Sequence, residues 1–219
     1  MKTKYPHYFD IAVTSYCQAI CAGCQRNDIY GNKVPELVEA HMPLEKFEFI
    51  MDQIDSLQNC NGIRLCGELG DPMMHPKIEA IIDRIIKTTP NIEINTNGGL
   101  RKPVWYEYMA KKYQETGNIQ IEWGIDGTDH DTNWKYRRGV NWQRAMDNMI
   151  AWHSGGGKTM WSFLLFDWNY HQIPTAIQMA NSMGIPIKFS ITVSDNGLDG
   201  MIPGPRMEEA KQLLREYGC

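Results

Sequence analysis

Residues 8–24 have the sequence Tyr8-Phe9-Asp10-Ile11-Ala12-Val13-Thr14-Ser15-Tyr16-Cys17-Gln18-Ala19-Ile20-Cys21-Ala22-Gly23-Cys24, in which an apolar run leads directly into a group of three cysteines. The apolar and β-branched run Tyr8–Thr14 predicts a buried β-strand. The cysteines Cys17, Cys21 and Cys24 fall within eight residues of one another. Closely spaced soft thiolates are ligands for iron–sulfur clusters and for zinc, so this stretch predicts a strand followed by a metal-binding loop.

The same alternation of strand and connecting segment recurs along the chain. Six apolar runs predict strands, at Tyr8–Thr14, Gly62–Cys66, Asn91–Thr96, Ile119–Ile125, Met160–Phe166 and Pro186–Thr192. Apolar residues at helical spacing follow each of them, in Leu44–Leu57, Ile78–Ile85, Val104–Met109, Trp142–Met149, Ile173–Ala180 and Met207–Leu214. Strands that alternate with helices indicate an α/β fold with a parallel sheet, and apolar strands are expected where both faces of the sheet are covered. Periodicity alone leaves open whether the sheet is flat or curled.

Polar and glycine-rich clusters come directly after the predicted strands. The cysteines follow the first strand, and residues 67–76, 96–99 and 126–139 follow the second, third and fourth. In parallel α/β folds, ligands bind at the carboxyl ends of the strands. We therefore expect these segments to form one binding site.

The cysteine triad lacks a fourth ligand of the same kind nearby. A structural zinc site takes four protein ligands, and the closest histidines in the sequence are His7 and His41. Three ligands leave one coordination position open, which suits a metal centre that binds a small molecule. Buried cysteines, or a zinc knuckle completed by a distant histidine, are the alternatives that the sequence leaves open.

The Cys-x3-Cys-x2-Cys spacing directly after the first strand resembles that of the radical S-adenosylmethionine (SAM) superfamily. The resemblance implies a partial (β/α)6 TIM-like barrel in which Cys17, Cys21 and Cys24 hold a [4Fe-4S] cluster. It also implies that the amino and carboxylate groups of SAM chelate the fourth iron. One departure is Gly23, because the superfamily usually has an aromatic residue before the third cysteine.

Two further segments resemble SAM-binding motifs of this superfamily. Gly70-Asp71-Pro72, followed by Met73-Met74-His75-Pro76, resembles the Gly-Glu-Pro motif after the second strand, with Asp71 in place of the glutamate. An acidic group there can bind the ammonium of the methionine moiety, and Gly67-Glu68 is the alternative register. Asn95-Thr96-Asn97-Gly98 resembles the Thr-Asn-Gly motif after the third strand, which implies cofactor contacts from Asn97 and Gly98.

The fourth strand ends in a similar pattern. Gly124-Ile125-Asp126-Gly127 resembles a Ser-Ile-Asp-Gly motif in which the serine, a ribose contact, is replaced by Gly124. The resemblance assigns Asp126 to cofactor binding. An arginine downstream can pair with the methionine carboxylate, and Arg138 fits the spacing better than Arg137, although a solvated charge pair is an equal alternative.

Bulk properties fit a single domain over residues 1–219. The chain has 42% hydrophobic residues, 22% charged residues and a formal net charge of −4, so nothing favours nucleic acid or an anionic membrane as a partner. The polar start and the lack of a long apolar run predict a cytoplasmic protein. The superfamily's peptide-modifying (SPASM/twitch-type) members often carry a second cysteine-rich domain, of which Cys219 would be a first ligand if one followed.

The resemblance implies reductive cleavage of SAM to a 5′-deoxyadenosyl radical that abstracts a hydrogen atom from a substrate. An electron donor such as flavodoxin or ferredoxin would supply the electron. The pattern of motifs favours a peptide or protein as substrate. A small molecule such as a deazaguanine precursor is an alternative, as is a non-catalytic metal-binding module.

Overall fold

The computed structural model describes residues 7–22, 24–28, 30–67, 69–191 and 204–218. Its strands form one parallel sheet in chain order, with each strand paired to the next. They are β1 (His7–Asp10), β2 (Cys60–Leu65), β3 (Asn91–Thr96), β4 (Asn118–Gly124), β5 (Lys158–Leu165) and β6 (Ile187–Ile191). The prediction of an α/β fold with a parallel sheet is confirmed.

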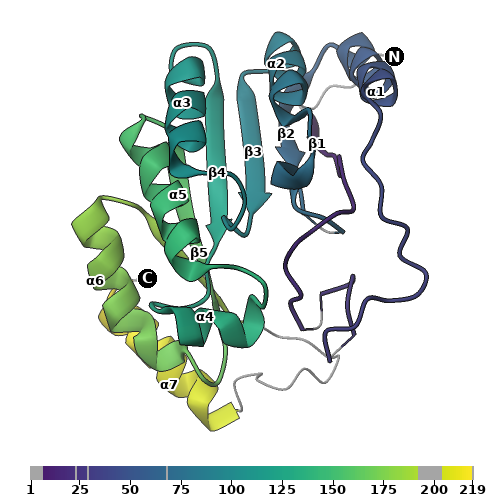
Figure 1. The fold of residues 1–219 in the computed structure, drawn as a ribbon. Coiled ribbons are helices and arrows are strands. Elements are labelled where there is room, and N and C mark those ends of the chain that lie inside the picture. Colours follow the sequence, from purple (N-terminus) through teal and green to yellow (C-terminus); the bar gives the residue numbers. More distant parts are fainter. Residues whose placement is uncertain (1–6, 23, 29, 68, 192–203, 219) are drawn as a thin grey trace.

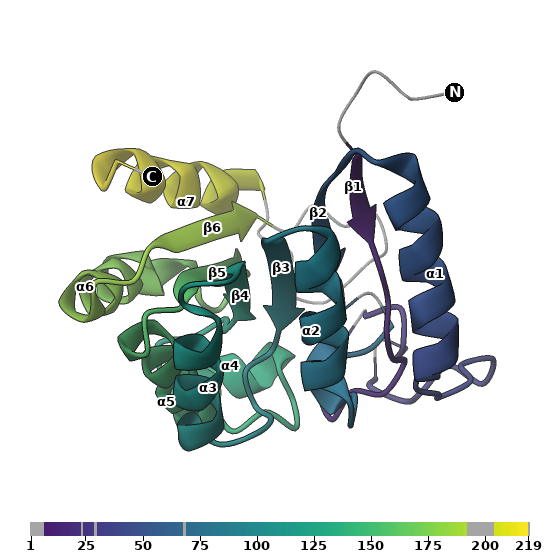
Figure 2. The same ribbon diagram turned by 90° about the horizontal axis from the view of Figure 1, so that it is seen from above.

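Helices connect and cover the strands. The α-helices are α1 (Leu44–Leu57), α2 (Ile78–Thr88), α3 (Pro103–Tyr113), α4 (His130–Tyr136), α5 (Trp142–Ser154), α6 (Ile173–Met183) and α7 (Gly204–Glu216), and two 3₁₀ turns are η1 (Pro72–Met74) and η2 (Tyr170–Gln172). Figure 1 shows the elements in order around the sheet. Figure 2 shows that the strands follow an arc, with α1, α2, α3, α5 and α6 along its outer side. The curled sheet is the partial barrel that the resemblance implied.

The apolar helix faces explain why the helices lie on the outer side of the arc. In α2, Ile78, Ile81, Ile82 and Ile85 are all buried, and they recur at the spacing that places them on one face of the helix. Burying an isoleucine side chain contributes about 1.5–3 kcal/mol. This row alone therefore fixes α2 firmly against the sheet.

The two faces of the sheet differ in polarity, which corrects the expectation of apolar strands covered on both faces. Along β3, Ile92, Ile94 and Thr96 are buried, whereas the intervening Asn91, Glu93 and Asn95 are only half-buried. β4 and β5 alternate in the same way. Because successive side chains point to opposite faces of a strand, the buried set packs under the helices and the less buried set lines the concave face. This second set is polar along β3 but includes Met160 and Leu164 in β5.

Strand β1 is shorter than the predicted Tyr8–Thr14. After Asp10, the amide of Ile11 still donates to the carbonyl of Arg64, but Thr14 forms an isolated antiparallel bridge with His41. The chain therefore leaves the sheet before the cysteines and continues as a loop supported by the segment that precedes α1. The end of the predicted sixth strand, Thr192, lies outside the described residues.

No helix within the described ranges combines the length and the apolar character that crossing a bilayer requires.

Candidate metal and cofactor site

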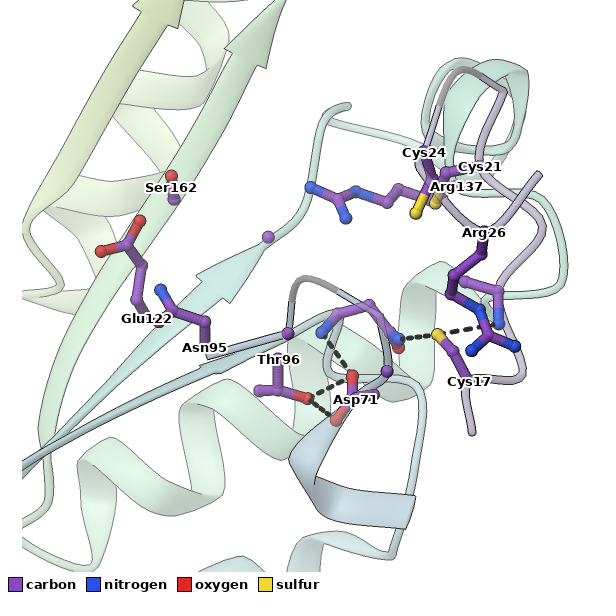
Figure 3. Close-up of a pocket in the computed structure, with 15 residues that line it drawn as sticks. Cys17, Cys21, Cys24, Arg26, Asp71, Asn95, Thr96, Glu122, Arg137 and Ser162 are labelled. Carbon is purple, nitrogen blue, oxygen red and sulfur yellow. Dashed lines mark hydrogen bonds between the residues drawn. The ribbon is translucent and has the colours of Figure 1, made fainter. Parts of the chain in front are cut away.

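A cavity of about 200 Å³ opens at the carboxyl ends of the strands. The side chains of Cys17, Cys21 and Cys24 line it, together with groups from the loops after β2, β3 and β4. Figure 3 shows the three cysteines at one end of the cavity. The structure thus brings the triad into one site with the other polar segments, as the strand-end pattern predicts.

The cysteine loop is held by hydrogen bonds to its own backbone and to the loop after β3. The Cys17 Sγ accepts from the amide of Ala19 at 3.4 Å and from Asn97 Nδ2 at 3.6 Å, and the amide of Cys24 donates to the carbonyl of Cys21 at 3.3 Å. Burial raises the pKa of the Cys17 thiol to about 12, with a further rise from the Asp71 carboxylate and an opposing effect of the Arg26 charge. Burial also raises the pKa of Cys21. Metal binding must therefore displace protons from these thiols.

The three thiols line one cavity but do not form a preformed site for a single metal ion. Among the described residues, no group of three or more histidine, cysteine, aspartate or glutamate side chains is close enough to hold one metal ion. Neither described histidine near the loop faces the cavity. His41 Nδ1 lies 2.9 Å from Thr14 Oγ1, and His75 Nε2 lies 2.9 Å from the carbonyl oxygen of Met42.

Asp71 is a buried carboxylate that joins the ends of β2 and β3. It accepts hydrogen bonds from the amides of Met73 and Asn97, both at 2.9 Å, and from Thr96 Oγ1 at 2.9 and 3.0 Å. Burial raises the pKa of its carboxyl, and the donors from Asn97, Met73 and Thr96 oppose this rise. Asp71 lines the cavity, but both of its oxygens are already engaged by neighbouring groups. Glu68, the alternative acidic residue, lies outside the described residues.

Of the other predicted cofactor-binding residues near Asp71, Gly70 and Asn97 line the cavity and Gly98 does not. Gly70 lines the cavity, and a Cβ at this position would lie 2.2 Å from the carbonyl oxygen of Thr14, so only glycine fits against the loop before the cysteines. Asn97 also lines the cavity, and its Oδ1 accepts from Gln18 Nε2 at 2.6 Å. Gly98 instead packs behind the site, where its carbonyl accepts from Asn148 Nδ2 at 2.8 Å.

Asp126 lies behind the wall of the cavity and fixes Arg137. Its side chain is fully buried, and its Oδ2 lies 2.6 Å from Arg137 Nε. Its Oδ1 accepts from the amide of Leu164 at 2.7 Å, while its own amide donates to Asn133 Oδ1. Asp126 therefore ties the ends of β4 and β5 to α4, the short helix that leads to Arg137.

Arg137, and not Arg138, lines the cavity. Figure 3 shows its side chain extending from the cysteine end across the cavity. The Arg138 side chain points away, with Nη1 3.4 Å from the carbonyl oxygen of Tyr30, while its backbone carbonyl accepts from the amide of Ile20 in the cysteine loop. A Cβ at Gly124 would lie 2.7 Å from Arg137 Nη2. The missing side chain at position 124 thus leaves the space that the guanidinium occupies.

Several other residues of the cavity were not predicted from any sequence motif. Arg26, two residues after the triad, is buried and lines it. Asn95, Glu122 and Ser162 come from three adjacent strands and lie together at the end away from the cysteines (Figure 3). Their positions follow from the alternation of β3, β4 and β5, which becomes visible only when the register of the strands is known. Gly23 and Cys219 lie outside the described residues.

Solved structures with the same fold include those of two proteins, SuiB and anSMEcpe. Streptococcus suis SuiB bound to S-adenosylmethionine matches with a TM-score of 0.74 at 16% identity, over 97% of this chain and 48% of that one. SuiB bound to the precursor peptide SuiA gives the same TM-score and identity, over 97% of this chain and 46% of that one. The protein anSMEcpe with bound AdoMet matches with a TM-score of 0.75 at 10% identity, over 96% of this chain and 59% of that one. The chain thus spans about half the length of SuiB.

Sequence comparison identifies the family directly. No curated protein sequence matches the chain. The family model of the Radical SAM superfamily, however, matches residues 11–180, which include the triad, the cavity and strands β2 to β5. The chain therefore belongs to the radical SAM superfamily.

Proposed function

We propose that the chain is a radical SAM enzyme in which Cys17, Cys21 and Cys24 hold a [4Fe-4S] cluster. The observation that carries the proposal is the convergence of three thiols on one cavity that also contains the Arg137 guanidinium. Thiolates are the ligands that iron–sulfur clusters require. A cation in the same cavity complements the carboxylate of a bound SAM.

The donor set fits a cluster better than a single zinc ion. A structural zinc site takes four protein ligands, whereas the described lining of the cavity contributes three thiols and no histidine. A four-iron cluster spreads its cysteine ligands around a larger core and, with three of them, leaves one iron without a protein ligand. That open site is where SAM would bind.

Arg137 is the residue that we assign to the SAM carboxylate. Its Nε is held by Asp126, so its Nη atoms remain directed at the cavity, where they can form a bidentate pair with a carboxylate. Asp71 and Asn97 shape the opposite wall, and we propose that Gly70 and Asn97 contact the methionine part of SAM. Asp126 and Gly98 then act through the residues that they position, and Arg138 anchors the cysteine loop through its carbonyl.

When bound and reduced, the cluster supplies one electron for the cleavage of SAM to methionine and a 5′-deoxyadenosyl radical. The protein's own contribution is to orient the cosubstrate and to exclude water. The thiol loop is partly covered by its own backbone, and Cys21 is only 6% exposed. Such burial favours a site in which a reactive radical meets the substrate before solvent.

For the substrate we favour a peptide or protein. SuiB and anSMEcpe, which share the fold, have been solved with bound peptides, and the cavity of this chain ends at the polar side chains of Asn95, Glu122 and Ser162. A small molecule such as a deazaguanine precursor is the second candidate, because the cavity itself is small. We keep the predictions of a single domain over residues 1–219, a cytoplasmic location and a flavodoxin or ferredoxin as electron donor.

Anaerobic reconstitution with iron and sulfide tests the proposed function. We expect four irons and four sulfides per chain, and formation of 5′-deoxyadenosine from SAM in the presence of dithionite. Cys21→Ala should abolish both, whereas Cys60→Ala, a matched thiol on β2 outside the cavity lining, should retain them. One zinc per chain without nucleoside formation would contradict the proposal, and nucleoside formation by Cys21→Ala would contradict the ligand assignment.

A further inference from the structure

Arg26 is a buried cation in which one nitrogen atom, Nε, has no hydrogen-bond partner among the described residues. The residue is 2% exposed and lines the cavity next to the cysteine triad. Its Nη1 donates to the carbonyl of Leu69 and its Nη2 to Glu39 Oε1 at 2.8 Å. Its Nε is buried and has no hydrogen-bond partner among the described residues.

An unsatisfied donor of this kind is costly and indicates a missing acceptor. A buried donor without a partner has lost its hydrogen bonds to water with nothing in exchange, and the cost is larger for a charged group. The two other nitrogens of Arg26 have protein partners, so the guanidinium is held in place while the Nε–H remains available. Figure 3 shows the Arg26 guanidinium on the side of the cavity occupied by Cys17.

The counter-ion of Arg26 is shared with a second cation, which favours an additional anion beside Arg26. Glu39 is shared by Arg26 and by Lys33, whose Nζ lies 2.6 Å from Glu39 Oε2. The two cations thus share one carboxylate, and the buried Asp71 carboxylate lines the same cavity. A [4Fe-4S] cluster with three thiolate ligands carries net negative charge, which the Arg26 guanidinium beside it complements.

We propose that the Arg26 Nε–H donates a hydrogen bond to a sulfur of the cluster unit and thereby raises the cluster's reduction potential. The inference rests on the proposed function, because it needs the cluster. Reduction adds one electron from an external reductant to the cluster, and no bond is formed or broken. The added negative charge strengthens the hydrogen bond and the attraction to Arg26, so the reduced state gains more than the oxidised state. Arg26 thus acts through the cluster, by changing its reduction potential, and does not need to contact SAM.

A redox titration monitored by electron paramagnetic resonance, without SAM, tests this proposal on the reconstituted chain. Because the hydrogen bond is stronger in the reduced state, Arg26→Gln should lower the equilibrium constant for one-electron reduction about tenfold, a fall of about 59 mV in midpoint potential. The control is Arg84→Gln, because Arg84 is also buried and ion-paired but contacts Glu48, Asp52 and Asp55 on helix α1. Its midpoint should equal that of the wild type.

A second variant gives a change of opposite sign, which guards against poor folding of Arg26→Gln. Glu39→Gln removes the carboxylate that partly neutralises Arg26 and should raise the midpoint potential. Unchanged midpoints in both variants would overturn the proposal. So would an unchanged midpoint combined with weaker SAM binding in Arg26→Gln, which would assign the Nε–H to the SAM carboxylate. Failure of the wild-type chain to assemble a four-iron cluster would instead contradict the proposed function.

Discussion

The ion pair between Asp126 and Arg137 gives the sharpest prediction about stability. In Asp126→Asn, the side chain keeps its shape and loses its charge. Asp126 is fully buried, and Arg137 is 22% exposed, so the variant leaves a mostly buried guanidinium without its counter-ion. Removing one partner of a buried pair costs about 3–5 kcal/mol. Because water reaches part of Arg137, we expect the lower end of this range, about 3 kcal/mol.

Urea unfolding of the metal-free protein, followed by circular dichroism, measures this loss directly. With a slope of about 2 kcal/mol per molar urea, the midpoint should fall by about 1.5 M with the slope unchanged. Asp167→Asn is the matched control, because Asp167 also pairs with an arginine, Arg206, but the two side chains are 31% and 50% exposed. Exposed pairs contribute about 0–1 kcal/mol. Equal shifts in the two variants, or a loss below 1 kcal/mol in Asp126→Asn, would show that the buried pair contributes no more than an exposed one.

Two further predictions concern single contacts. Burial lowers the pKa of His75, whose Nδ1 accepts from the amide of Lys77 while its Nε2 faces the carbonyl of Met42. Since only the unfolded chain binds the proton readily, the free energy of unfolding should fall as pH drops below about 6.5. The urea midpoints measured at pH 7.0 and at pH 5.5 should therefore differ less in His75→Gln than in the wild type. Equal differences would contradict this. Gly124→Ser should weaken SAM binding about fivefold by displacing Arg137, as measured by calorimetry on the reconstituted protein. Gly124→Ala should weaken SAM binding to the same extent. Tighter SAM binding to the serine variant than to the wild type would show that the Arg137 side chain moves aside without losing its contact with SAM.

Local sequence patterns were sufficient to predict the sheet and most helices. Rows of apolar residues such as Ile78 to Ile85 encode both the helix and its buried face, so α2 was predictable. The seven-residue helix α4 was missed because it has a single described buried residue, Asn133. Its start is marked by a capping aspartate, Asp129, which accepts from the amide of Thr132. Such a cap is visible in the sequence but is too common to define a helix alone.

The candidate site was predictable where chemistry depends on local spacing. The three cysteines lie within one short loop after β1, so they were expected to line the same cavity. The choice between Arg137 and Arg138 depends instead on the path of the chain after α4, which the sequence does not reveal. Arg26 was not predictable, because its burial depends on Leu69 and Glu39, which are distant in the sequence. The motifs predicted Asp71 and Asp126 as cofactor-binding residues, and the structure places both within hydrogen-bond networks that hold the strand ends together. Direct contact of either residue with SAM stays a prediction.

The proposed function depends on an iron site that has no protein ligand and is open to SAM. Electron paramagnetic resonance of the dithionite-reduced, reconstituted chain, recorded before and after addition of SAM, tests this most directly. We expect the signal of a reduced [4Fe-4S] cluster and a clear change in its g-values when SAM binds. An iron-loaded protein whose spectrum is identical with and without SAM would contradict the proposed function.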